Sequence, residues 1–240
     1  MYSNIDWRKV LYIMLALGLV SSLAGAIDIG NLVLTLPGLI LGLTVHEFSH
    51  AKMANRLGDP TPDYQGRLTL NPLAHIDPTG MVCLIFAGFG WGKAVQIDPS
   101  YFRNPPRDNM LVALAGPVSN LILAFILFII FPFAYYFFFP GNAVLNETLY
   151  TMILLAASIN LSLFAFNLLP FPPLDGSKIL AYFLKGKARE FVWNLERYSL
   201  LIIAILFITN IPSLLISPVV NAIGNFMISI SEKIAYLIMF

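Results

Sequence analysis

Long apolar stretches separated by short polar segments run along almost the whole chain. A helix needs about 20 apolar residues to cross a bilayer. Six stretches approach or exceed that length: residues 9–27, 32–55, 110–139, 148–169, 199–217 and 218–240. The pattern therefore predicts an all-α polytopic membrane protein with about six transmembrane helices.

Three shorter segments add smaller elements to this architecture. Residues 79–92 are apolar but cover only about half of a bilayer crossing, so we interpret them as a re-entrant hairpin. Residues 66–70 and 92–97 alternate between apolar and polar positions, which favours two short strands. The complete prediction adds to the helices a re-entrant hairpin and a small membrane-associated sheet.

Composition supports a membrane location for the whole chain. The 240 residues are 58% hydrophobic and 11% charged, and the mean hydropathy is +0.78. A soluble domain cannot bury that much apolar surface. The net charge of +1 offers no basic surface for nucleic acid, and a single cysteine, Cys83, excludes an internal disulfide. We expect one transmembrane domain over residues 1–240.

The basic residues indicate the orientation. All lysines and arginines except Lys233 fall in segments that alternate crossings place on one side, whereas residues 28–31, 140–147 and 209–213 have none. The positive-inside rule then places the N-terminus, 56–109 and 175–198 in the cytoplasm. The start of the chain resembles a signal peptide, but its apolar run is long for one, so we expect a retained helix. The chain is expected in the inner (cell) membrane.

Two histidines and a glutamate stand at the end of the second apolar stretch. On a helix, His46 and His50 are four residues apart, so both rings project from one face and can share a metal ion. Glu47 can reach a water on that metal instead of the metal itself. If the helix enters at Leu32, His46 lies about 21 Å deep at 1.5 Å per residue. The pattern predicts metal-activated hydrolysis inside the membrane.

A zinc site of this type needs a third protein ligand. Asp175 and His75 are the two candidates. We favour Asp175, because the span before it arrives on the same side as His50 and the prolines at 170, 172 and 173 unwind the chain. His75 lies in a segment of turn-forming residues, where it could instead line the mouth of the site and bond a substrate carbonyl or a metal ligand.

HEFSH at 46–50, together with NLLPFPPLDG at 167–176, resembles the site-2 protease family of intramembrane zinc metalloproteases. That family pairs HExxH on one helix with NxxPxxPxDG at the end of a later one. Ala115-Gly116-Pro117 with Asn120 and the order of the elements extend the resemblance over about 32–190. The chain is most similar to short members without a PDZ or CBS domain. Ser177 departs from members that have a second glycine there.

The resemblance implies Zn²⁺ as the cofactor. It implies His46, His50 and Asp175 as its ligands and Glu47 as the catalytic base, and it assigns no metal role to His75. The catalytic core would cover about 32–190, with 191–240 as C-terminal helices.

Other polar residues have two possible roles each. Asn167 is the best candidate for an oxyanion donor, or it makes a hydrogen bond where the helix unwinds. Asn120 and Asn160 are interpreted as packing hydrogen bonds between helices. An edge of the expected sheet could receive a substrate as an added strand.

We therefore expect an intramembrane zinc endopeptidase that hydrolyses peptide bonds within or near transmembrane segments of membrane proteins, close to the cytoplasmic side, as in regulated intramembrane proteolysis. Its partners would be transmembrane protein substrates and the lipid bilayer. The alternatives are an HExxH protease of the prenyl-protein processing type, a membrane metal-binding transporter, and a catalytically silent protease-like binding module. The oligomeric state stays open.

Overall fold

The computed structural model describes residues 29–81, 90–137, 142–209 and 211–239. The first expected span, 9–27, lies outside these residues. So does most of the expected re-entrant hairpin at 79–92.

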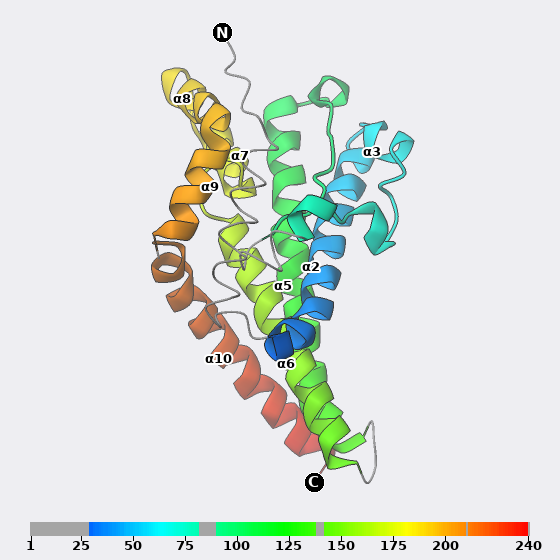
Figure 1. Ribbon diagram of the computed structural model, residues 1–240. Coiled ribbons are helices and arrows are strands. Elements are labelled where there is room, and N and C mark those ends of the chain that lie inside the picture. The colour runs from blue at the N-terminus through cyan, green and yellow to red at the C-terminus, as the bar shows by residue number, and fades with distance from the viewer. Residues whose placement is uncertain (1–28, 82–89, 138–141, 210, 240) are drawn as a thin grey trace.

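Four long helices build the framework (Figure 1). They are α2 (Ile29–Arg56), α5 (Pro105–Phe137), α6 (Ala143–Asn167) and α10 (Ile211–Met239). Helix α5 packs against α2, α6 and α10, and α2 also packs against α6. The bundle core contains Phe128 and Phe131 of α5 with Leu161 of α6 and Met227 of α10.

Short elements gather at one end of this bundle, where α2 finishes and α5 begins (Figure 1). They are α3 (Thr61–Tyr64), η1 (Pro72–Ala74), η2 (Pro99–Tyr101), α7 (Asp175–Phe183), α8 (Lys187–Leu195), η3 (Glu196–Tyr198) and α9 (Ser199–Ile208). Helix α7 packs against α5 and α8. This end therefore contains both the last turns of α2 and the chain that follows α6.

The expected number of spans, about six, is wrong. In the part of the chain that the structure describes, four helices are long and apolar enough to cross a membrane: Gly30–Arg56, Pro105–Ala134, Ala143–Asn167 and Ile211–Ile238. The stretch at 199–217 does not form one long helix. It is divided between α9, which has only 10 residues, and the start of α10. Proline disfavours helix in the preceding residue but fits the first helical turn. Accordingly α10 begins just before Pro212, and it continues through Pro218.

The expected sheet is also wrong. Residues 66–70 form a turn, bends and irregular backbone, 93–97 are extended without a partner strand, and the described residues contain only one isolated antiparallel bridge, between Ile76 and Gly92. The carbonyls of Lys93 and Ala94 both accept hydrogen bonds from the Arg67 side chain, at 2.7 and 2.9 Å. A buried side chain thus replaces the neighbouring strand.

Small residues let α2 and α6 approach closely. A Cβ on Gly38 would meet the Cα of Ala156 at 2.5 Å, and one on Gly42 would meet Oδ1 of Asn160 at 2.6 Å. Glycine is thus required at both positions by the neighbouring helix. The close approach brings backbone carbonyls of α2 within reach of Asn160.

The chain unwinds between α6 and α7. Helix α6 ends at Asn167, and residues 168–174, which contain three prolines, are not helical before α7 begins at Asp175. A Cβ on Gly176 would overlap the carbonyl oxygens of Leu168 and Leu169, so glycine allows α7 to start against the unwound segment. The hydroxyl of Ser177 donates to Leu174 O at 2.7 Å and stabilises the same turn. Asp175 is thereby fixed at the first residue of a short helix.

Candidate metal centre

His46 and His50 face each other on the inner side of α2. Their Nε2 atoms are 3.0 Å apart, and the two rings pack edge to face. Both side chains are buried. The spacing of four residues on a helix therefore brings two ligand atoms to one point, as the sequence indicates.

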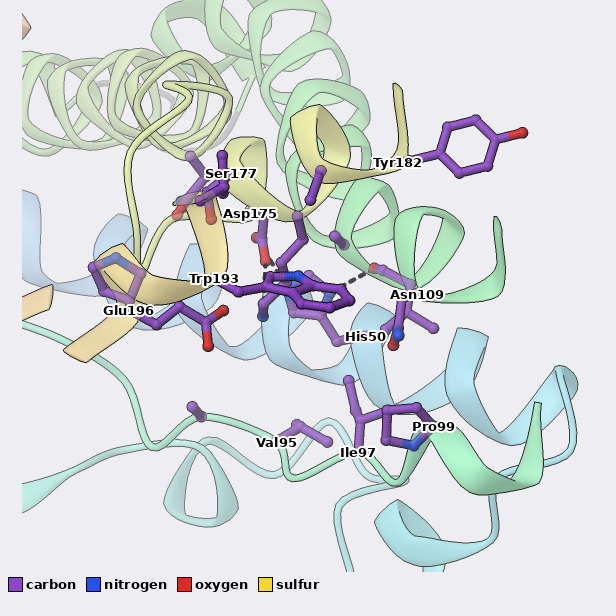
Figure 2. A pocket seen from close by; sticks show the side chains of 18 of the residues that line it. His50, Val95, Ile97, Pro99, Asn109, Asp175, Ser177, Tyr182, Trp193 and Glu196 are labelled. Atoms are coloured by element: carbon purple, nitrogen blue, oxygen red, sulfur yellow. Dashed lines mark hydrogen bonds and ion pairs between the residues drawn. The ribbon is translucent and has the colours of Figure 1, made fainter. Parts of the chain in front are cut away.

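Asp175 brings an oxygen to the same point from the start of α7. Its Oδ2 lies 3.2 Å from Nε2 of His46 and 3.1 Å from Nε2 of His50. Among the described residues, His46, His50 and Asp175 form a group whose ligand atoms all lie within 4.8 Å of one another. Figure 2 shows Asp175 and His50 close together in the pocket.

The outer nitrogens of both rings determine their tautomers. Nδ1 of His50 donates to the carbonyl of Val112 at 2.7 Å. Nδ1 of His46 lies 2.6 Å from Oδ1 of Asn120, whose own amide nitrogen is engaged elsewhere, so this nitrogen also donates. A neutral imidazole with a proton on Nδ1 has only a lone pair on Nε2. When both imidazoles are neutral, both Nε2 atoms are therefore acceptors.

Three acceptor atoms that face one another at 3.0–3.2 Å would be stabilised by a metal ion bound between them. Tetrahedral ligands at the usual distance from zinc lie about 3.3 Å from each other. Two neutral imidazoles and a carboxylate are also the donor set that zinc takes in hydrolytic enzymes. The residues present fit a zinc ion in chemistry and spacing.

A chain of amides supports His46 from behind. Asn120 of α5 donates to the carbonyl of Gly42 at 3.0 Å and to Oδ1 of Asn160 at 2.9 Å. Asn160 of α6 donates in turn to Ala156 O at 2.8 Å and to Gly38 O at 3.3 Å. Both asparagines thus form hydrogen bonds between helices, as expected from the sequence. Asn120 has a further role that was not expected, because it also orients the candidate ligand His46.

Gly116 of α5 lies directly against the two rings. A Cβ there would overlap the imidazole of His50 and would meet Cε1 of His46 at 2.7 Å. The structure thus gives a reason for glycine at this position, since α5 can pass the two histidines only without a side chain there.

Glu47 lies beside this group on the wall of a cavity of about 880 Å³. Its Oε2 accepts a hydrogen bond from the backbone N–H of Val95 at 3.0 Å. Its other oxygen, Oε1, makes no hydrogen bond to the described parts of the chain. Ala94, Val95 and Ile97 of the extended segment line the same cavity, and this contact could not be found from spacing in the sequence.

The remaining predicted residues lie at different distances from the centre. Asn167 lines the cavity, and its Nδ2 donates to Leu163 O at 3.0 Å, which leaves a second N–H. His75 is fully buried in the loop after α3, where its Nε2 donates to Thr69 O at 2.7 Å. His75 does not belong to the group of three ligand atoms.

The wall opposite α2 comes from helices whose part in the site the sequence did not indicate. Lys178, one turn after Asp175, has its Nζ 3.8 Å from Oδ1 of that residue. Trp193 of α8 and Glu196 of η3 complete this side of the cavity (Figure 2). Helix α8 is tied to α7 by Arg189, whose Nε donates to Ala181 O and Leu184 O at 3.0 and 2.9 Å.

The amide chain can be tested by comparing its two members. Replacing Asn120 with alanine removes the acceptor for His46 Nδ1, and loss of such an outer partner lowers metal affinity about 10–100-fold. Asn160→Ala breaks the contact between helices but leaves His46 untouched, so we expect zinc affinity within about threefold of wild type. Competition titration against a zinc chelator measures both. Equal losses in the two variants would show that Asn120 acts only through packing.

Comparison with known proteins is consistent with this geometry. The family model described as Peptidase family M50 matches residues 132–209. YwhC of Bacillus subtilis (strain 168), named as a zinc metalloprotease, is 39% identical over 184 residues, covering 77% of this chain and 84% of that protein. Rip2 of Mycolicibacterium smegmatis, named likewise, is 33% identical over 187 residues, covering 75% and 69%. No solved structure matches the chain.

Proposed function

Since the chain belongs to peptidase family M50 and is an intramembrane zinc metalloprotease, we propose that its substrates are membrane proteins cut within or near their transmembrane segments. The observation that carries this proposal is the cluster of three facing acceptors at one point of a membrane helix bundle. Family membership also removes the transporter and the prenyl-processing alternatives.

His46, His50 and Asp175 would hold the zinc ion, because their three ligand atoms face one point at the spacing of zinc ligands. When bound, zinc acts as a Lewis acid that polarises the scissile carbonyl and acidifies water. The amide of Asn120 and the carbonyl of Val112 accept hydrogen bonds from the two Nδ1 atoms and hold both Nε2 atoms turned toward that point. The protein thus supplies a preformed set of three ligands.

Glu47 would act as the general base. Its carboxylate reaches the cavity next to the metal centre and has one oxygen free of hydrogen bonds to the described residues. It would take a proton from the attacking water and pass it to the leaving amine. The second N–H of Asn167 would stabilise the negative charge that develops on the carbonyl oxygen.

A transmembrane substrate must unwind before it can be cut, because a helix keeps its carbonyls in hydrogen bonds four residues apart. The cavity is open enough to admit both water and an extended peptide, at about 880 Å³. Its walls include Pro173 of the unwound segment before Asp175 and Ala94, Val95 and Ile97 of the extended segment. Irregular backbone at membrane depth is tolerated where it lines such a cavity.

We assign the catalytic end of the bundle to the cytoplasmic face of the inner membrane. The end that carries α3, α7 and α8 holds every described lysine and arginine except Lys233 (Figure 1). An excess of basic residues is typical of cytoplasmic loops. His46 is 10 residues before the end of α2, which places it about 15 Å below that end at 1.5 Å per residue.

Metal removal tests the proposed site. Wild-type protein in detergent should contain about one zinc per chain, lose cleavage of a transmembrane substrate after chelation and regain it on addition of zinc. Asp175→Asn should lower zinc affinity and cleavage by more than the 10–100-fold that loss of an outer partner produces. The exposed Asp63→Asn serves as the matched control and should behave as wild type. Full zinc occupancy in Asp175→Asn would contradict the assignment of this ligand.

A further inference from the structure

Arg67, in the loop between α3 and η1, is a buried cation whose side-chain hydrogen bonds are all donated to backbone carbonyls. Only 4% of the residue is exposed. Its guanidinium donates to the carbonyls of Ala74, Lys93 and Ala94. Among the described residues it forms no ion pair with a carboxylate. Burial of a charge is costly unless it is fully hydrogen-bonded. Arg67 meets this requirement with backbone carbonyls alone, so its guanidinium joins the segments that carry them.

The three carbonyls belong to two segments that are far apart in sequence. Ala74 lies in η1, whereas Lys93 and Ala94 begin the extended segment. The same two segments are also joined by a backbone hydrogen bond from Lys93 N–H to His75 O at 2.8 Å. Arg67 thus fixes the extended segment to the loop after α3, at the residues that immediately precede Val95.

Val95 carries the hydrogen bond to Glu47. Its backbone N–H donates to Oε2 at 3.0 Å. Gly92 also lies close to the same carboxylate, since a Cβ there would be in ordinary contact with Oε1 of Glu47 at 3.8 Å, and it would press on His75 O at 3.2 Å. A shift of residues 93–95 would therefore move the only hydrogen-bond donor that the described residues offer to Glu47.

We infer that Arg67 is a positioning residue for peptide hydrolysis. It holds residues 93–95 so that the Val95 N–H fixes one oxygen of Glu47 and leaves the other for the proton of the attacking water. This inference rests on the proposed function, in which Glu47 is the general base. A misplacement of about 1 Å in a catalytic group can lower the rate about 100-fold, so a residue that fixes the position of Glu47 can affect the rate strongly without touching the substrate.

The first test compares Arg67→Gln with Val95→Pro in the full-length protein. Both changes release Glu47, one by freeing the segment and the other by removing the donor itself. Each should lower kcat for a transmembrane substrate about 10–100-fold, with KM within about twofold and zinc content unchanged. The exposed Arg103→Gln is the matched control and should keep wild-type kcat. An unchanged kcat in either Arg67→Gln or Val95→Pro would overturn the inference.

A double-mutant comparison separates positioning of Glu47 from a general effect on the fold. Adding Arg67→Gln to Glu47→Gln should leave the residual rate unchanged, because the group that Arg67 positions is already lost. A further 10–100-fold loss would show that Arg67 acts elsewhere and would overturn the inference. If Arg67→Gln fails to fold, Val95→Pro is compared in the wild-type and Glu47→Gln proteins instead. A further loss of rate in the Glu47→Gln protein would again overturn the inference. A Glu47→Gln variant with full activity would refute the proposed role of Glu47 itself, which is a distinct result.

Discussion

Replacing Glu47 with glutamine is expected to lower cleavage about 1,000-fold or more and to leave zinc binding intact. Glutamine has the shape of glutamate and can still accept the Val95 N–H, but it cannot take a proton from water. General-base catalysis contributes about 10²–10⁴ in rate, and a 1,000-fold loss corresponds to about 4 kcal/mol of transition-state stabilisation. Initial rates on a purified transmembrane substrate, measured together with zinc content, test both parts.

Glu190→Gln provides the control for this change. Glu190 is an exposed residue of α8. Its replacement by glutamine removes the same charge as Glu47→Gln, but away from the metal centre. It should leave both zinc content and rate at wild-type values. Full activity in Glu47→Gln would mean that another group accepts the proton, and loss of zinc in that variant would mean that Glu47 belongs to the ligand set.

Replacing Gly116 with alanine is expected to abolish zinc binding and cleavage while the protein stays folded. The new Cβ would overlap the imidazole of His50, and that ring cannot turn away without losing its hydrogen bond to Val112. Alanine is more favourable than glycine within a helix by about 1 kcal/mol, so helix α5 itself should become more stable. We expect at least about a 100-fold loss of activity, as for other misplacements of catalytic groups.

Gly224→Ala in α10 is the matched substitution. A Cβ at Gly224 would meet Leu161 at an ordinary contact distance of 3.6 Å. The same gain in helix preference should appear there without any loss of zinc or activity. Thermal unfolding followed by circular dichroism checks that both variants are folded. An active Gly116→Ala variant would show that α5 can move away from the histidines.

Hydropathy predicted the helices that form the site but not the C-terminal ones. The stretches at 32–55, 110–139 and 148–169 correspond to α2, α5 and α6. The stretches at 199–217 and 218–240 were divided at the wrong place, because the chain breaks between α9 and α10, just before Pro212, and α10 continues through Pro218. The expected strands failed for another reason: the carbonyls of Lys93 and Ala94 both accept hydrogen bonds from the Arg67 side chain instead of pairing with another strand.

For the site, local spacing was informative and long-range contacts were not. The four-residue interval between His46 and His50 is sufficient to predict their common face, and the prolines before Asp175 predict an unwound approach. The contact between Asn120 and His46 joins positions 74 residues apart, and Glu47 meets Val95 across 48 residues. No periodicity links such pairs, so their roles follow only from how the helices and loops pack.

The hydrogen bonds of Asn120 and Asn160 have a consequence for how a substrate enters. They join α2, α5 and α6 through the carbonyls of Gly38 and Gly42, at positions where the helices touch. Parting these helices would leave amides and carbonyls facing hydrocarbon without partners, each costing several kcal/mol. We therefore expect the contacts between these three helices to stay closed to a substrate, which would reach the candidate metal centre from another side of the bundle.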